Sequence, residues 1–212
     1  QGVVQSFADD HRVLAWDIYN EPGTECRLPD GRKARVGDEC LALLESVFDW
    51  VEEIRPSQPF TSGIYDFGLL DGEICQLQLG RSEIISFHSY GDVQALVGLV
   101  NLLRTHVTDR PLFCTEFLAR THGSRFQTHL PMFKEYDIAA FSRGLVAGRT
   151  QTHFDWETWE SPLPFLEPAV WHQDIFRWDG SPFDREEITR IRSVTWRDSI
   201  LQEAVEFLET KV

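Results

Sequence analysis

The chain has 212 residues, of which 42% are hydrophobic and 12% aromatic, a composition that excludes a disordered protein and suffices for one domain with a core. The formal net charge of −14 argues against nucleic acid and against an anionic membrane surface as partners, because both attract clusters of Lys and Arg. No apolar run reaches the ~20 residues that a membrane span requires. These properties favour a protein that acts on a neutral ligand.

The expected elements follow one another as alternating strands and helices. The expected strands, in chain order, are 13–21, 60–65, 83–88, 112–117 and 138–146. The expected helices are the end of one at 3–11 and those at 39–54, 69–79, 92–104, 126–136, 184–193 and 199–210. Such alternation with short connections predicts βα units and a parallel sheet. A polar loop is expected at 23–38 and a long loop at 150–171, and no GxGxxG follows the first strand, which leaves a dinucleotide fold without support.

The four cysteines are Cys26, Cys40, Cys75 and Cys114, and they form neither a CxxC pair nor a zinc-binding spacing. Cys114 lies inside an apolar strand and is expected to behave as a small buried hydrophobic residue. Cys26 and Cys40 bracket a polar loop and are able to pair in an oxidising compartment, a possibility that the sequence leaves open.

Two glutamates end two of the expected strands. The apolar run from Val13 stops at Asn20-Glu21-Pro22, and the run 111–118 carries Glu116 near its end. Parallel α/β folds collect their catalytic residues at the C-terminal tips of strands. A protonated acid and a carboxylate facing each other across one pocket are what glycosidic bond hydrolysis needs. The alternative is that both are ordinary ionic residues at strand ends.

The run 14–22 resembles the acid/base strand of the clan A glycoside hydrolases, which are retaining β-glycosidases with a (β/α)8 TIM barrel. Cellulase-like family 5 members are the nearest match. The ordered set Asn20-Glu21-Pro22, His88-x-Tyr90, Glu116 and Trp156 carries the resemblance. It implies that Glu21 is the acid/base and Glu116 the nucleophile.

The same resemblance implies an incomplete barrel. These enzymes carry Asn-Glu on the fourth strand and the nucleophile on the seventh, so residues 1–193 would supply the equivalents of strands four to eight, followed by a helical extension at 194–212. The chain opens on Gln1 rather than Met, and no signal peptide is visible. We therefore expect the N-terminal βα units elsewhere in a longer protein, and little activity from these 212 residues alone.

Four further residues are expected to bind substrate. Beside the acid, Asn20 would hold the sugar 2-hydroxyl, and His88 another hydroxyl, while Tyr90 would hydrogen-bond the nucleophile. Trp156, with Trp159 as a rival, would stack under the sugar ring. The alternatives are a strand-end histidine, a packing tyrosine and tryptophans that cover the C-terminal segment.

The sequence thus predicts a retaining O-glycoside hydrolase that cleaves β-linked glycans by double displacement, without cofactor or metal, and with an oligo- or polysaccharide as its partner. The resemblance favours a secreted or periplasmic location. One alternative is a non-catalytic carbohydrate-binding relative or an inactive fragment. Another is a metal-dependent hydrolase, which the sequence disfavours because His122, His129 and His172 show no ligand spacing with carboxylates and are expected in surface or loop positions.

Overall fold

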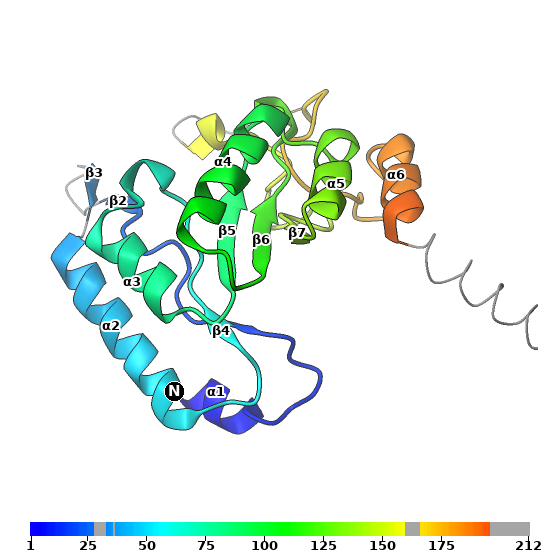
Figure 1. Ribbon diagram of the computed structural model, residues 1–212. Helices are drawn as coiled ribbons and strands as arrows, with labels where there is room; N and C mark the ends of the chain where they lie inside the picture. The colour runs from blue at the N-terminus through cyan, green and yellow to red at the C-terminus, as the bar shows by residue number, and fades with distance from the viewer. Residues whose placement is uncertain (28–32, 36, 160–165, 196–212) are drawn as a thin grey trace, which may run out of the picture. The chain divides into compact units, whose positions relative to one another are not determined.

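The computed structural model describes residues 1–27, 33–35, 37–159 and 166–195 (Figure 1). The chain divides into two compact units. The first unit comprises Gln1–His88 and Gly98–Thr115, and the second comprises Ser89–Val97 and the residues from Glu116 onward. The division passes through β5 (Ile85–Ser89) after His88 and through β6 (Leu112–Phe117) after Thr115.

Short strands, three whole helices and the C-terminal part of α4 (Val93–His106) form the first unit. Its β1 (Trp16–Asp17) pairs in parallel with β4 (Phe60–Thr61), and Ile64, just after β4, bridges in parallel to Phe87 of β5. The helices are α1 (Gly2–Phe7), α2 (Gly37–Ile54) and α3 (Glu73–Arg81), with a 3-10 turn, η1, at Phe67–Leu69. Strands β2 (Glu25–Arg27) and β3 (Lys33–Arg35) pair antiparallel inside the segment that was predicted to be a polar loop.

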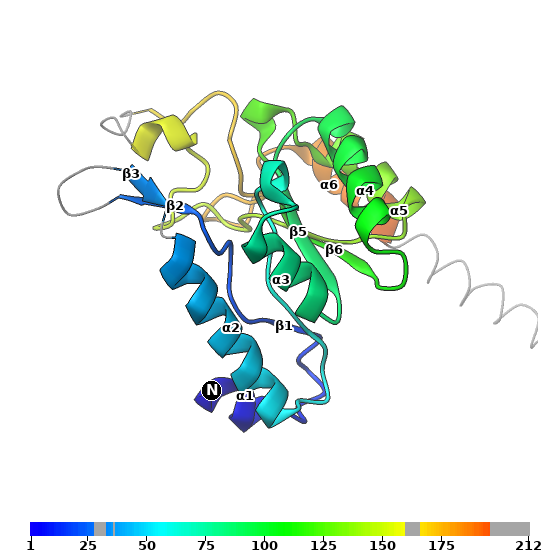
Figure 2. The ribbon, with the colours of Figure 1, turned by 60° about the vertical axis from the view of Figure 1, so that its left-hand side comes forward.

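The core of the first unit lies along one face of α2. Leu44, Phe48 and Val51 recur at helical spacing, are buried, and pack with Phe60 of β4. The rings of Phe48 and Phe60 meet edge to face with centroids 6.2 Å apart. Figure 2 shows α1 packed near the C-terminal end of α2. The amphipathic pattern predicted for 39–54 is therefore confirmed as the element around which this unit packs.

The prediction of a long buried strand at 13–21 is wrong in extent. Only Trp16 and Asp17 are in β1, Trp16 is half-buried, and the side chain of Leu14 is 66% exposed. Among the described residues β1 pairs with β4 alone, so its other edge has no neighbouring strand to cover it. An edge strand with one partner leaves apolar side chains exposed that a central strand would bury.

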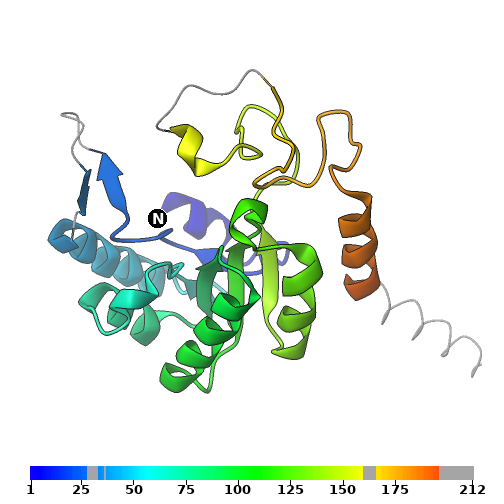
Figure 3. The same ribbon diagram turned by 90° about the horizontal axis from the view of Figure 1, so that it is seen from above.

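From β5 onward the chain continues the alternation that the sequence predicted, in segments that belong to both units. Strands β5, β6 and β7 (Ala139–Ser142) are neighbours in that order, with α4 (Val93–His106) and α5 (Phe126–Glu135) in the two connections. Two 3-10 turns, η2 (Arg120–His122) and η3 (Trp156–Trp159), lie in the later loops, and α6 (Arg185–Thr195) packs beside α5 (Figure 3). The expected helix at 199–210 falls outside the described residues.

The fold class is therefore mixed α/β with parallel pairing, as predicted. The strand predicted at 112–117 is β6 with the same bounds, and the other four are found in shorter or slightly shifted form. None of the helices in the described part of the chain combines the length and the apolar character of a membrane span.

Aromatic rings and one histidine fill the core of the second unit. Phe117 of β6 meets Phe133 and Phe126 of α5 with centroids 4.9 and 5.3 Å apart. His129 is fully buried, stacks on Phe117, accepts the backbone N–H of Arg125 and donates to the carbonyl of Gly91. The expectation of a surface or loop role for His129 is wrong, and burial lowers the pKa of its ring.

A buried ion pair between Arg120 and Glu187 connects the loop segments of this unit to α6. The guanidinium of Arg120 donates to both carboxylate oxygens of Glu187 at 2.8 and 2.6 Å, and each side chain is 3% exposed. Its remaining donors reach the carbonyls of Trp171, Gln173 and Asp174. Every part of the buried charge therefore has a partner, which is the condition under which such a pair is stable.

Removing the charge of Glu187 should destabilise the second unit strongly. We expect Glu187→Gln to lower the free energy of unfolding by about 3 kcal/mol, because the guanidinium of Arg120 would stay buried without a counter-charge. The neighbouring exposed Glu186→Gln should change it by less than about 0.5 kcal/mol. Urea unfolding followed by circular dichroism measures both, and equal values for the two variants would contradict the role of the ion pair.

The buried ring of His129 should make stability depend on pH. The unfolded chain binds a proton at its imidazole near pH 6.5, whereas the folded protein accepts one only at lower pH. Since the unfolded state then binds more protons, the free energy of unfolding should fall as the pH drops from about 6.5 toward the folded pKa. Urea unfolding at pH 7.5 and 5.5 should show a smaller difference in His129→Gln, and an unchanged difference would contradict this.

Candidate functional site

The turn that carries Glu21 is held by hydrogen bonds from three side chains of the first unit. Glu21 has a positive φ of 46°, which a non-glycine residue adopts only when its surroundings impose it. Ser62 Oγ donates to the carbonyl of Tyr19 at 2.6 Å, Tyr65 donates to the carbonyl of Gly23 at 3.0 Å, and Thr24 Oγ1 donates to the carbonyl of Glu21 at 2.7 Å. These bonds hold the backbone before, at and after Glu21, and they thereby restrict where its carboxylate can lie.

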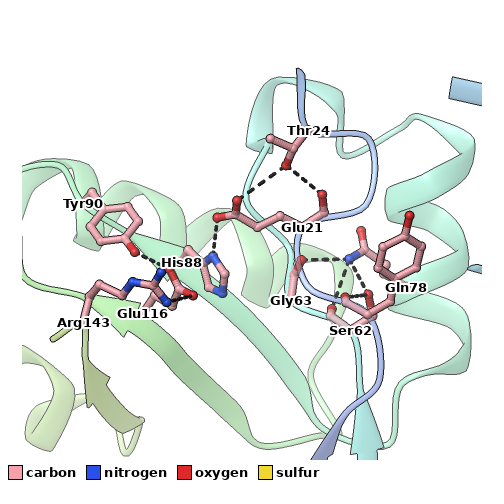
Figure 4. Close-up of polar contacts among 10 residues, drawn as sticks. Glu21, Thr24, Ser62, Gly63, Gln78, His88, Tyr90, Glu116 and Arg143 are labelled. Atoms are coloured by element: carbon pink, nitrogen blue, oxygen red, sulfur yellow. Dashed lines mark hydrogen bonds and ion pairs between the residues drawn. The ribbon is translucent and has the colours of Figure 1, made fainter. Parts of the chain in front are cut away.

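A buried amide on α3 supports this turn from beneath. Gln78 Nε2 donates to the carbonyls of Ser62 and Gly63 at 3.1 and 3.0 Å (Figure 4). Since the amide is buried, losing these bonds would leave two carbonyls and two N–H groups without partners. The segment after β4 is therefore fixed, and through Ser62 it fixes the residues before Glu21.

His88 holds the carboxylate of Glu21. Its Nδ1 lies 2.5 Å from Glu21 Oε1, so the two groups are joined by a short hydrogen bond (Figure 4). His88 is buried on β5, whereas the carboxylate is partly exposed. A Cβ added at Gly63 would lie 3.0 Å from His88 Nε2 and 3.3 Å from Asp17 Oδ2, so the absence of a side chain at Gly63 makes room for the imidazole.

Cys40 is a free thiol beside the same turn. Its Sγ accepts the backbone N–H of Gly23 at 3.0 Å and contacts the hydroxyl of Tyr19 at 3.1 Å. That hydrogen bond from the tyrosine, together with burial, raises the pKa of Tyr19 to about 12. Cys40 is therefore not in a disulfide here, and the side chain of Cys26 lies outside the described residues. Cys75 and Cys114 are buried and free, as expected for Cys114.

In the second unit two donors hold the carboxylate of Glu116 near the end of β6. The hydroxyl of Tyr90 donates to one oxygen, and Arg143 Nη1 donates to the other at 3.1 Å (Figure 4). Arg143 directly follows β7, and its backbone N–H donates to the carbonyl of Phe117 at 2.7 Å. Tyr90 was predicted at this carboxylate, whereas Arg143 was not, because its only sign in the sequence was its place at a strand tip.

Trp156 joins the same group of residues. Its ring meets Tyr90 edge to face with centroids 5.0 Å apart, and it also contacts the rings of His172 and His122 at 4.5 and 5.1 Å. The second unit thus brings together three predicted residues, Tyr90, Glu116 and Trp156. The first unit brings Glu21 to His88 and leaves Asn20 exposed. The side chain of Trp159 lies outside the described residues.

Two histidines of the second unit lie with a carboxylate, contrary to the expectation that no ligand set exists. One potential ligand atom from each of His122, Asp155 and His172 lies within 4.8 Å of the other two. His172 lies in a loop, which is one of the two positions expected for it, but its side chain is fully buried rather than at the surface. Burial lowers the pKa of its ring to about 4. The spacing of these residues in the sequence gave no sign of the cluster.

No protein-family model and no curated protein sequence matches this chain. Its structure is similar to the catalytic core of a xylanase A, with 13% identity and a TM-score of 0.56 over 92% of this chain and 68% of that one. It is similar to a putative β-galactosidase from Bacteroides fragilis, with 14% identity and a TM-score of 0.57 over 88% of this chain and 29% of that one. A thermostable xylanase mutant from Cellvibrio japonicus matches with 14% identity and a TM-score of 0.52 over 85% and 64%.

These likenesses concern the fold. They confirm the predicted resemblance to clan A glycoside hydrolases at that level, since solved structures of such enzymes overlap most of the described chain. The chain spans 68% of the xylanase A catalytic core and 29% of the β-galactosidase. At identities of 13% and 14% these likenesses assign no role to the residues of the site.

Adding a methyl group at Gly63 should disturb His88. We expect Gly63→Ala to shift the imidazole resonances of His88 and to lower the free energy of unfolding by about 1–3 kcal/mol, because the added Cβ overpacks a buried contact. The control Gly98→Ala, at an exposed position inside α4 with no atom within 4 Å of the added Cβ, should raise it by about 0.5–1 kcal/mol. Unchanged His88 resonances in Gly63→Ala would contradict the close approach.

Proposed function

We propose that this chain is part of a retaining O-glycoside hydrolase that cleaves β-linked glycans. In this proposal β1, β4, β5, β6 and β7 correspond to strands four to eight of a (β/α)8 barrel whose earlier units belong to the rest of the protein. The order of the strands, the helices between β5, β6 and β7, and the likeness to a xylanase catalytic core over 92% of the chain support it.

The surroundings of Glu116 carry the proposal. A nucleophile in double displacement must present an oriented carboxylate oxygen to the anomeric carbon. The tyrosine hydroxyl and the guanidinium each donate to a different oxygen of Glu116, which restricts its rotation and complements its negative charge.

Glu21 suits the second role because its partner can exchange a proton. An acid/base residue gives up a proton in the first step and takes one from water in the second. The imidazole of His88 at 2.5 Å is able to donate to the carboxylate or to accept from it. Glu21 therefore has a partner that adapts to both protonation states, whereas Glu116 has two fixed donors.

The proposed reaction has two steps. Glu21 protonates the glycosidic oxygen while Glu116 attacks the anomeric carbon, the C–O bond to the leaving group breaks, and a glycosyl ester forms on Glu116. Glu21, now ionised, takes a proton from water, whose oxygen attacks the same carbon and releases Glu116. The sugar ring would stack on Trp156, and the amide of Asn20 would bind its 2-hydroxyl.

Removing either carboxylate in the complete protein should abolish turnover of an aryl β-glycoside. We expect Glu116→Ala to lower kcat by at least about a thousandfold, whereas the exposed Glu135→Ala on α5 should retain activity. With azide, Glu116→Ala should give the α-glycosyl azide, because azide attacks from the vacated side. Glu21→Ala should give the β-glycosyl azide, because azide opens the glycosyl ester.

The same assays distinguish the proposed hydrolase from the alternative functions. Oligosaccharide binding by calorimetry without any product would identify a non-catalytic carbohydrate-binding relative. Turnover that persists in Glu116→Ala without azide would overturn the two-glutamate mechanism, and loss of that remaining turnover on chelation would identify a metal-dependent hydrolase.

A further inference from the structure

We propose that His122, Asp155 and His172 bind a divalent transition metal ion, with Zn²⁺ as the best fit, through two imidazoles and one carboxylate. All three residues belong to the second unit. Nitrogen and oxygen ligands in this ratio suit zinc and its neighbours in the first transition series. The site includes neither Glu21 nor Glu116, and the binding of an ion does not depend on the proposed hydrolysis.

The spacing of the three groups fits a metal ion better than direct hydrogen bonds. Asp155 Oδ2 lies 3.7 Å from His122 Nε2, and one possible ligand atom from each of the three residues lies within 4.8 Å of the other two. A direct hydrogen bond would bring these atoms to about 2.7–3.2 Å. Two ligand atoms of a tetrahedral zinc ion with bonds of about 2.0–2.1 Å lie about 3.4 Å apart. Small side-chain movements would therefore place all three around one ion.

The ring of His172 supplies a second, independent observation. It is fully buried, Thr121 Oγ1 lies 2.5 Å from its Nδ1, and its Nε2 has no hydrogen-bond partner among the described residues. A buried imidazole nitrogen without a partner is unfavourable. One ring nitrogen held by an oxygen and the other available is the usual state of a metal-ligating histidine. A bound ion would provide the partner that this ring lacks.

Access and protonation are both suitable for an ion. The side chains of His122 and Asp155 are 47% and 27% exposed, so an ion can enter from solvent and keep water in its fourth position. Metal ligands must be unprotonated. Hydrogen bonds from Thr121 and from the backbone N–H of Glu157 outweigh burial and lower the pKa of Asp155, and burial lowers that of His172.

The ion would join three loop segments that lie far apart in the sequence. His122 ends η2, Asp155 directly precedes η3, and His172 lies in the segment before α6. The ring of Trp156 contacts both histidine rings. We therefore expect the bound ion to fix the orientation of Trp156.

Metal titration of the chelator-treated, dialysed protein tests the proposal without any need for turnover. We expect one equivalent of Zn²⁺ to bind in competition with a chromogenic chelator. Asp155→Asn and His122→Gln, both at partly exposed positions, should weaken binding at least about tenfold. The control His11→Gln, at an exposed histidine of the first unit, should bind like the wild type.

Co²⁺ provides a second readout at the same site. It should quench tryptophan fluorescence in the wild type and quench it less in Trp156→Phe, because Trp156 lies against the two proposed imidazole ligands. Circular dichroism should show that each variant is folded. Absence of Zn²⁺ binding, or equal affinity and stoichiometry in the wild type and Asp155→Asn, would overturn the proposal whatever the outcome of the glycosidase assays.

Discussion

The second unit depends on the burial of one guanidinium. Arg120 is paired with Glu187 and donates to the carbonyls of Trp171, Gln173 and Asp174, while its own backbone N–H donates to the carbonyl of His172 at 2.9 Å. A buried charge is tolerated only with a full set of partners, so the loss of any of these contacts would leave part of the charge without one. This requirement connects η2, the 171–174 segment and α6, and thereby holds His172 under Trp156.

In the first unit a neutral amide, that of Gln78, holds backbone segments in place as the guanidinium of Arg120 does in the second unit. Gln78 on α3 donates to the carbonyls of Ser62 and Gly63, and Ser62 donates to the carbonyl of Tyr19. Removing an amide from water costs less free energy than removing an ion. The Gln78 amide also holds fewer chain segments than the Arg120 guanidinium does. The result is still sufficient to hold Glu21 in its left-handed conformation, within 2.5 Å of His88.

Periodic patterns in the sequence predicted the elements well, because α2 and β6 show their burial directly as apolar spacing. The site was predicted in part: the resemblance implied the contact of Tyr90 with Glu116, whereas His88, which was expected to bind a sugar hydroxyl, contacts Glu21. Arg143, the Arg120–Glu187 pair and the His122, Asp155 and His172 cluster were missed. These contacts are made by residues in loops or beyond strand ends, whose conformations no periodicity encodes. The β2–β3 hairpin was missed because its strands are short and polar.

A chain of ring contacts links the two kinds of chemistry in the second unit. His172 packs on Trp156, Trp156 meets Tyr90 edge to face, and the hydroxyl of Tyr90 donates to Glu116. Packed aromatic rings have few alternative arrangements, because their close contacts allow little displacement. An ion bound at the histidines would therefore restrict Trp156, and Trp156 would in turn restrict the donor that orients Glu116. The geometry around the proposed nucleophile thus depends on loop residues that never touch it.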